Sequence, residues 1–213
     1  MSDRSKAERF FTETEKEKIA ATVADVESRT TGEVVVMVVD SSDPYADAEI
    51  IGILLGSSSL SLLLSVLFFH SSLFWFIALT LFLLAPFHFL VTKVAPLKAL
   101  LIVNRRRDEA VRERALSAFV EKGLHQTREN TGVLFFLSLL ERRVWVLADR
   151  GIYQKIGQET LNQFANGVSQ GVRQGRAYEA LIEAIQAVGR LLSKHFPMKP
   201  PNIDELPDKV ITD

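Results

Sequence analysis

The chain has 213 residues, a formal net charge of −1 and no cysteine. The missing cysteines exclude a disulfide framework, a zinc–cysteine site and thiolate chemistry, and the near-zero charge gives no sign of a nucleic-acid partner. These averages conceal two charged parts of the chain separated by one long uncharged run.

The part before residue 49 predicts one helix and one strand. Two overlapping capping boxes, Thr12 with Glu15 and Thr14 with Glu17, mark the start of the helix. Glu33–Asp40 follows as a continuous apolar, β-branched run, which is typical of a strand buried on both faces. The polar first residues contain no apolar segment, so we expect no cleavable signal peptide.

The uncharged run is Ile50–Val91, 42 residues without Asp, Glu, Lys or Arg. About 20 apolar residues of helix cross a bilayer core of roughly 30 Å, so this run suffices for two crossings. It is interrupted at His70–Ser72, which predicts a transmembrane hairpin with spans at 50–69 and 73–91. A pair of core helices in a soluble protein is the alternative, but such helices carry a polar face that this run lacks.

Basic residues after the hairpin predict its orientation. Lys93, Lys98 and Arg105–Arg107 follow the second span, and Lys and Arg near a span are retained on the cytoplasmic side. We therefore expect a multi-pass protein of the cell membrane with both termini in the cytoplasm. Arg105, Arg106 and Arg107 are also candidates for contact with anionic lipid head groups.

The part after the hairpin predicts further helices and strands. We expect a helix at 107–125, strands at 133–140 and 144–148, and helices in the C-terminal region. The segment 200–213 is expected to be an extended tail, ordered where Ile203 and Leu206 dock. Residues 1–49 and 92–199 would together form one cytoplasmic domain, an α/β sandwich of βαβ type into which the hairpin is inserted.

Topology assigns the polar residues to two edges of the sheet. A strand–helix–strand crossover is parallel, so Asp40 and Glu141, which follow the first two strands, are expected at one edge. The third strand runs back and would bring Asp149 to the opposite edge.

The segment 131–152, which spans the last two predicted strands, resembles the TPM domain, the family of the thylakoid acid phosphatase and photosystem II repair proteins. Thr31–Val36 and Gly175–Tyr178 support the resemblance, which covers most of residues 10–195 outside the hairpin. It implies a βαβ sandwich that is often tethered to a membrane. Some members are reported as phosphatases or as binders of divalent metal.

The resemblance also indicates candidate ligand-binding residues. Family members carry two adjacent acidic residues and an arginine after the second strand, where this chain has Leu140, Glu141 and Arg142. Glu141 and Arg142 are therefore the first candidates and Asp149 the next. A divalent cation prefers several carboxylate oxygens, so with one carboxylate missing we expect no resident metal, and weak Ca²⁺ or Mg²⁺ binding at most.

Two functions of different class remain. The first is a non-catalytic binding module anchored at the cytoplasmic membrane surface, and the second is a metal-assisted phosphatase tethered there. The first is favoured because the acidic pair is incomplete. The expected partners are the lipid bilayer and either a protein or a second copy of the chain, with small residues such as Gly56 and Ser57 in the first span suited to close helix packing.

Overall fold

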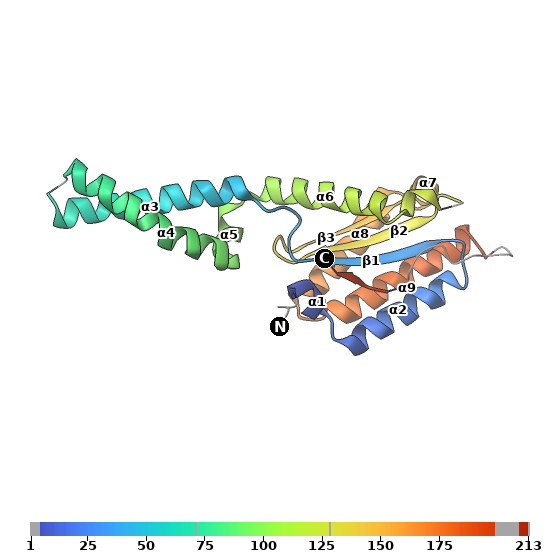
Figure 1. The fold of residues 1–213 in the computed structure, drawn as a ribbon. Coiled ribbons are helices and arrows are strands. Elements are labelled where there is room, and N and C mark those ends of the chain that lie inside the picture. Colours follow the sequence, from blue (N-terminus) through green and yellow to red (C-terminus); the bar gives the residue numbers. More distant parts are fainter. Residues whose placement is uncertain (1–4, 71, 128, 199–208, 213) are drawn as a thin grey trace. The chain divides into compact units, whose positions relative to one another are not determined.

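The computed structural model describes residues 5–70, 72–127, 129–198 and 209–212, which divide into two compact units (Figure 1). The first unit comprises Met1–Ser42 and Asp108–Asp213, and the second comprises Asp43–Arg107. The described elements are α1 (Lys6–Phe10), α2 (Glu13–Glu27), β1 (Glu33–Val39), α3 (Ala46–Phe68), α4 (Leu73–Lys93), α5 (Ala95–Leu101), α6 (Asn104–Glu121), the 3₁₀ helix η1 (Leu124–Gln126), β2 (Gly132–Ser138), β3 (Arg143–Ala148), α7 (Arg150–Ile156), α8 (Gln158–Arg173), α9 (Ala177–His195) and β4 (Ile211–Thr212).

The described strands of the first unit form one sheet in the order β3-β2-β1-β4. Strands β1 and β2 are parallel, with Val39 opposite Ser138, and β3 returns antiparallel to β2. The predicted directions of these three strands are confirmed. Strand β4, parallel to β1, was not predicted, because a two-residue strand has no periodicity to detect. The predicted docking residues Ile203 and Leu206 lie outside the described residues.

Helices cover both faces of the sheet (Figure 1). Every residue of β1 and β2 is buried, which confirms two strands with no solvent-facing side. Alternate side chains of these strands, such as Val36 and Phe135, pack with α2, α8 and α9. The intervening ones, such as Met37 and Phe136, pack with α6 on the other face. The unit is thus an α/β sandwich, as predicted.

Helix ends depend on local signals that the sequence shows only in part. At the start of α2, the Thr12 amide donates to Glu15 Oε2 at 2.8 Å and the Glu15 amide to Thr12 Oγ1 at 3.3 Å, so this capping box forms. Helix α6 begins at Asn104 and ends at Glu121, so both of its ends lie a few residues earlier than predicted. Gly123, with φ of 77°, lies in the left-handed region just after the helix. Helices α1, α5 and α7 were not predicted, because five to seven residues are too few for a clear helical pattern.

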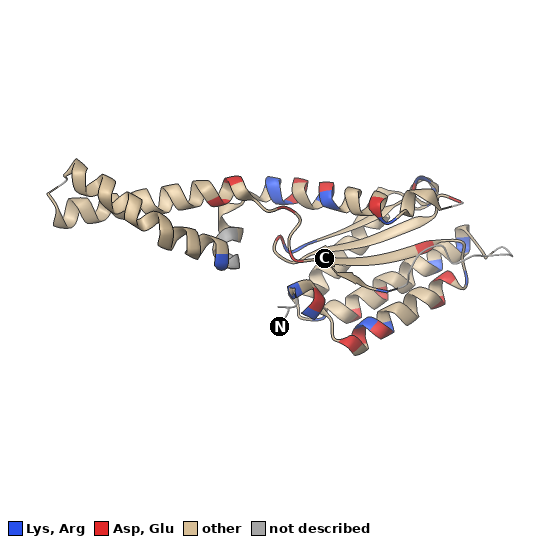
Figure 2. Cartoon of the chain, in the orientation of Figure 1, with Lys and Arg blue, Asp and Glu red and all other residues tan. Residues whose placement is uncertain are grey.

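The second unit contains two apolar helices. Helices α3 and α4 each have a mean hydropathy of 2.2 and are long and apolar enough to cross a membrane. Charged residues occur only near the ends of these helices (Figure 2). Small residues of α3 lie on its buried face, and hydroxyls there bond to the other arm of the hairpin: Ser61 Oγ donates to the Phe76 carbonyl at 2.6 Å and Ser65 Oγ to the Ser72 carbonyl at 3.1 Å.

Candidate functional site: a cationic pocket at one edge of the sheet

Glu141 lies at the carboxyl-terminal edge of β1 and β2, in the turn that leads from β2 to β3. Glu141 is only 2% exposed. Its carboxylate accepts hydrogen bonds from the Ser42 amide at 3.0 Å, from Ser41 Oγ at 3.4 Å and from Ser138 Oγ. Glu141 therefore joins the β2–β3 turn to the segment that follows β1.

Asp40 also joins two segments of the chain at the same edge. Its carboxylate accepts from the amides of Lys6 at 3.2 Å and Ala7 at 2.5 Å, which are the first residues of α1. The short helix α1 is thereby fixed beside the ends of the two central strands. Asp40 and Glu141 share an edge, as the topology predicted, and each carboxylate holds a neighbouring segment in place.

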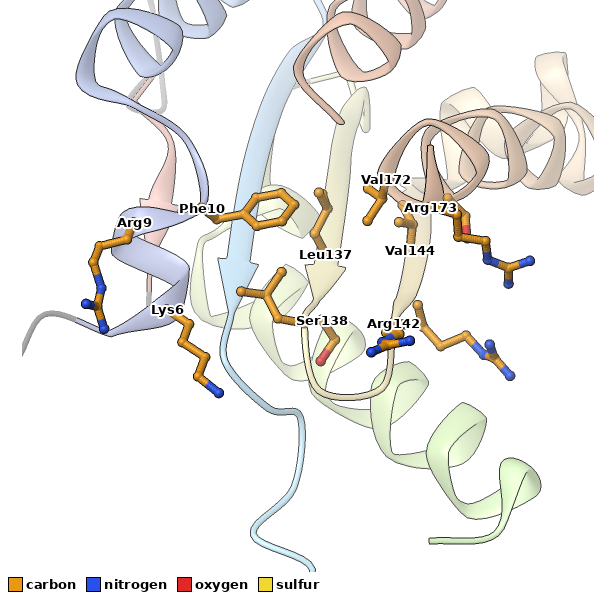
Figure 3. A pocket seen from close by; sticks show the side chains of 12 residues that line it. Lys6, Arg9, Phe10, Leu137, Ser138, Arg142, Val144, Val172 and Arg173 are labelled. Carbon is orange, nitrogen blue, oxygen red and sulfur yellow. The ribbon is translucent and has the colours of Figure 1, made fainter. Parts of the chain in front are cut away.

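A pocket of about 680 Å³ opens at this edge (Figure 3). We call it the edge pocket; its walls combine apolar side chains with a rim of cations contributed by α1, the β2–β3 turn with the start of β3, and the end of α8. Its lining consists of Lys6, Arg9, Phe10, Leu137, Ser138, Leu139, Arg142, Arg143, Val144, Ser169, Val172 and Arg173. Its volume falls within the roughly 300–1,000 Å³ of small-molecule sites.

The cations of the edge pocket differ in their partners. Arg143 Nε donates to Asp108 Oδ1 at 2.6 Å, and Arg9 Nε donates to the Ser5 carbonyl at 3.4 Å. Lys6, Arg142 and Arg173 form no ion pair with any carboxylate among the residues that the structure describes. The rim therefore carries positive charge that the described chain does not neutralise.

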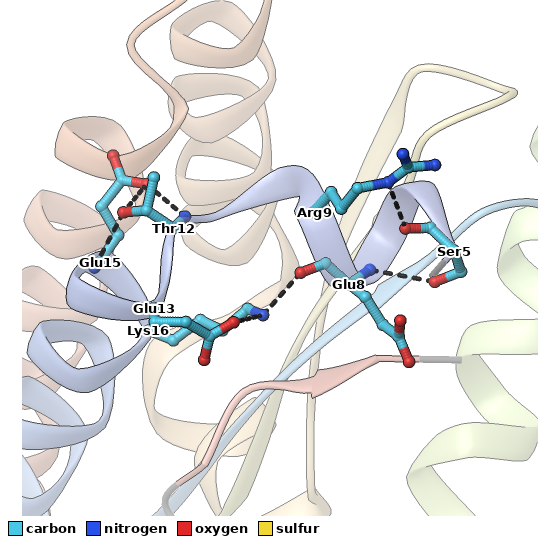
Figure 4. Close-up of polar contacts among 7 residues, drawn as sticks. All are labelled: Ser5, Glu8, Arg9, Thr12, Glu13, Glu15 and Lys16. Carbon is cyan, nitrogen blue, oxygen red and sulfur yellow. Dashed lines mark hydrogen bonds and ion pairs between the residues drawn. The ribbon is translucent and has the colours of Figure 1, made fainter. Parts of the chain in front are cut away.

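Helix α1 owes its position to contacts with α2 as well as with Asp40 (Figure 4). Ser5 Oγ caps α1 by accepting from the Glu8 amide at 3.0 Å. Lys16 Nζ of α2 donates to the Glu8 carbonyl at 2.6 Å and to Glu13 Oε1 at 2.8 Å. The bond from Lys16 to the Glu8 carbonyl joins α1 to α2 and so holds the α1 wall of the edge pocket against the rest of the unit.

Arg142 has a backbone conformation set by the turn. Its φ of 54° lies in the left-handed region, which non-glycine residues adopt at a cost of order 1 kcal/mol. The buried Glu141 before it and the paired Arg143 after it fix the turn on both sides. This geometry places the Arg142 side chain on the pocket rim (Figure 3).

Asp149 lies at the other end of β3, as the topology predicted. Its amide donates to the Gly132 carbonyl at 2.8 Å, and its Oδ1 accepts from the Arg150 amide at 2.6 Å as the N-cap of α7. The second oxygen, Oδ2, is buried and has no partner among the described atoms. Asp149 is thus separated from Glu141 and Arg142 by the length of β3.

The arginine triplet belongs to the chain segment after the apolar helices. Arg106 pairs with Asp43 at 2.8 Å within the second unit. In the same unit, a guanidinium nitrogen of Arg107 donates to the Ala99 carbonyl. Both side chains therefore contribute to the local structure of the second unit.

The edge residues do not fit the divalent metal that the family resemblance implies. Both oxygens of Glu141 already accept hydrogen bonds from protein donors, and a metal would have to displace them. Within the described part of the chain, no group of three or more Asp, Glu or His side chains is arranged to hold a metal ion.

Sequence reasoning found Arg142 but missed most of the pocket. Lys6, Arg9 and Phe10 lie on a helix too short to be predicted, and Arg173 is the last residue of a longer helix. The one available signal was the Gly175–Tyr178 motif, which begins two residues after Arg173.

The comparisons with known proteins agree on the fold. Residues 98–191 match the model of the TPM domain. The chain is also similar to the BA42 protein of the psychrophilic bacterium Bizionia argentinensis, solved by NMR, with a TM-score of 0.60 and 19% identity over 96% of each chain. No curated protein matches the chain. Residues 98–191 of this chain are therefore similar to the TPM domain, and the chain as a whole shares the fold of the BA42 protein.

Proposed function

We propose that this chain is a membrane-anchored binding module that holds an anionic ligand in the edge pocket without converting it. The observation that carries the proposal is the trio Lys6, Arg142 and Arg173, which lines one pocket and has no carboxylate partner among the described residues. A charge-assisted bond to a bound anion is about twice as strong as a neutral hydrogen bond. An anionic group bound in this pocket would therefore gain from contact with these cations.

The contacts of Glu141 support binding in preference to metal-assisted chemistry. A metal-assisted phosphatase needs carboxylates that are available to its cation, whereas this carboxylate accepts from Ser41, Ser42 and Ser138. In this proposal Glu141 shapes the turn, and Arg142 beside it contacts the ligand. Asp149, at the far end of β3, belongs to a different surface.

A phosphatase is the second candidate, and one observation favours it. Arg142 and Arg143 line the same pocket as the hydroxyl-bearing Ser138 and Ser169. Arginines that converge on a phosphoryl group stabilise the charge of its transfer. The same geometry thus suits a phosphate ester either as a bound ligand or as a substrate.

The deciding experiment uses the full chain in phosphatidylcholine nanodiscs. Binding of inorganic phosphate and glycerol 3-phosphate is measured by calorimetry, and hydrolysis of p-nitrophenyl phosphate is measured with and without Mg²⁺ or Ca²⁺. We expect binding that Arg142→Gln weakens about tenfold or more, because a lost charge-assisted bond costs roughly 1.5–3 kcal/mol. Arg190→Gln is the matched control, since Arg190 is exposed on α9 outside this pocket.

Two outcomes contradict the proposal. Binding that is absent, or equally strong in Arg142→Gln, would remove the pocket as the ligand site. A metal-dependent hydrolysis that both Glu141→Ala and Arg142→Ala abolish would establish the phosphatase instead.

The anchor in this proposal is the helix pair α3 and α4, with both termini in the cytoplasm. Support comes from the apolar length of both helices and from the basic residues that follow the second. Reporter fusions at residues 1, 71 and 213 test it, with cytoplasmic signals expected at both ends. An external signal at both termini would reverse the orientation, and signals on different sides would exclude a hairpin.

A further inference from the structure

The lining of the edge pocket contains apolar side chains as well as cations. Besides the cations, it presents Phe10, Leu137, Leu139, Val144 and Val172. The close-up shows the Phe10 ring on one side, with Leu137, Val144 and Val172 across from it (Figure 3). A bare phosphate on the rim would leave these apolar walls in contact with water.

The cations form an exposed rim of the pocket, and the apolar side chains of its walls are less exposed. Lys6 and Arg9 of α1 and Arg173 of α8 are exposed, whereas Leu137 is buried and Phe10 and Val172 are half-buried. A ligand that satisfies both needs an anionic head joined to an apolar chain. That combination defines an anionic amphiphile.

The connectivity of the chain indicates where such a molecule comes from. Strand β1 ends at Val39 beside the pocket edge, and α3 begins at Ala46, so a connection of six residues leads from the sheet edge to the first apolar helix. Both α3 and α4 are long and apolar enough to cross a membrane. A membrane that held them would supply anionic amphiphiles as its own lipids.

We infer that the edge pocket binds a membrane lipid with an anionic phosphate head group, its head on the Lys6–Arg142–Arg173 rim and part of an acyl chain against Phe10 and Val172. This inference rests on the proposed function and specifies its ligand. The head group supplies charge, and each methylene buried from water adds affinity on the order of fourfold. Affinity should therefore rise with chain length until the apolar walls are covered.

The first arm of the test is a chain-length series with the full chain in phosphatidylcholine nanodiscs, empty discs serving as the blank. The probes are glycerol 3-phosphate and the butyl, hexyl and octyl phosphates, with the matching alcohols as uncharged controls. We expect affinity to rise at least twofold per methylene over part of the series. Arg142→Gln should weaken every phosphate by the same factor, while Val172→Ser should reduce the gain per methylene.

Lys18→Gln and Arg190→Gln are the matched control variants, because both side chains are exposed and line no wall of this pocket. Neither should change the series. Thermal unfolding monitored by circular dichroism checks that each variant is folded, and Lys6→Gln replaces Arg142→Gln if the turn variant is unstable.

The second arm identifies the source of the ligand. The discs are doped with a phosphatidic acid that carries a photoreactive group in its acyl chain, and the labelled peptides are mapped. We expect label on the peptides of α1 or α8 as well as on α3 and α4. Arg142→Gln should remove the α1 and α8 label and leave the α3 and α4 label unchanged, which provides an internal standard.

The outcomes separate this inference from the proposed function. Binding of glycerol 3-phosphate with no gain in affinity along the alkyl series, or label confined to α3 and α4, would reject a lipid as the ligand. Either result would leave the proposal of an anion-binding module in place. Failure of every phosphate to bind rejects both. Binding of an acidic peptide in place of the alkyl phosphates also overturns the lipid.

Discussion

Glu141 illustrates how the meaning of a single residue depends on its neighbours. The family resemblance selects it as a ligand candidate, and the structure surrounds its carboxylate with donors from Ser41, Ser42 and Ser138. Glu141 is 2% exposed and its carboxylate has several donors, so it is well suited to stabilise a turn.

The first prediction concerns this residue. Glu141→Ala leaves the Ser42 amide and the Ser138 hydroxyl without their acceptor, and each buried donor left unsatisfied costs roughly 1–3 kcal/mol. We expect the free energy of unfolding of the full chain in micelles to fall by about 2–4 kcal/mol in urea titrations followed by circular dichroism.

Glu17→Ala is the control for this measurement, because Glu17 is exposed on α2 and has no side-chain partner among the described residues. Equal stability of Glu141→Ala and Glu17→Ala would show that the carboxylate does not hold the turn.

The second prediction compares two glycines in the first unit. A Cβ atom at Gly132 would lie 2.5 Å from the Leu124 carbonyl oxygen, whereas one at Gly167 would meet nothing within 4 Å. Gly132→Ala forces the backbone apart and should cost about 1–3 kcal/mol of unfolding free energy. Gly167→Ala, in the exposed face of α8, should instead gain about 0.5–1 kcal/mol. The same urea titration measures both, and a destabilised Gly167→Ala or a neutral Gly132→Ala would contradict the described packing.

At the scale of elements, the two apolar helices pair through small polar residues. Ser57, Ser61 and Ser65 lie on the buried face of α3, while large apolar side chains such as Leu62 and Leu67 are exposed. In a bilayer the exposed side chains are solvated by lipid, so association depends on close packing and hydrogen bonds between the helices. The arrangement suits a hairpin whose outer surface faces acyl chains.

The third prediction tests this pairing. Ser61→Ala removes the 2.6 Å bond to the Phe76 carbonyl, and such bonds in membranes contribute about 0.6 kcal/mol on average and up to about 1.7 kcal/mol. We expect amide exchange of the segment between α3 and α4 to accelerate roughly 3- to 20-fold in micelles, read by hydrogen–deuterium exchange.

Leu62→Ala is the control, because Leu62 is 57% exposed and should be neutral in the same experiment. Faster exchange in the Leu62 variant alone would indicate that the exposed apolar surface, and not the serine face, holds the helices together.

At the scale of the whole molecule, the cores of the sandwich exclude the inserted helices. Every buried residue in the two core clusters belongs to Met1–Ser42 or Asp108–Asp213. The strands β1 and β2 contribute to both clusters, one from each side of the insertion. Folding of the sandwich therefore depends on contacts between parts of the chain that the hairpin separates in sequence.

The fourth prediction follows from this separation. Replacing Ile50–Val91 with a short Gly/Ser linker should give a soluble protein that unfolds in one cooperative transition, because loop closure costs only about 0.6 kcal/mol per doubling of loop length. Circular dichroism and urea titration measure the outcome. A transition that is broad, or lost, would show that α3 and α4 contribute to the stability of the sandwich.

Much of the architecture follows from local patterns. The charge-free run, the two strands with no polar face and the capping box at Thr12 are each encoded within a short stretch of chain, so periodicity and composition suffice to detect them. The parallel pairing of β1 and β2 follows from the general rule for crossovers. The family resemblance rests on the same stretches.

The edge pocket could be predicted only at Arg142. Lys6 and Arg9 come from the start of the chain, Arg142 and Arg143 from the hairpin turn, and Arg173 from the end of α8. No spacing in the sequence relates these three segments, because they meet through Asp40 holding α1 and Glu141 holding the turn. The burial of Glu141 likewise depends on serines about 100 residues earlier in the chain.

The sequence by itself thus determined the longer helices, the central strands, their directions and the uncharged insertion, because each is set by side chains that are neighbours along the chain. Only the tertiary structure decided which charged residues line one pocket and which carboxylates accept the hydrogen bonds that hold its walls. Those properties depend on long-range hydrogen bonds and on desolvation, which act between residues far apart in sequence.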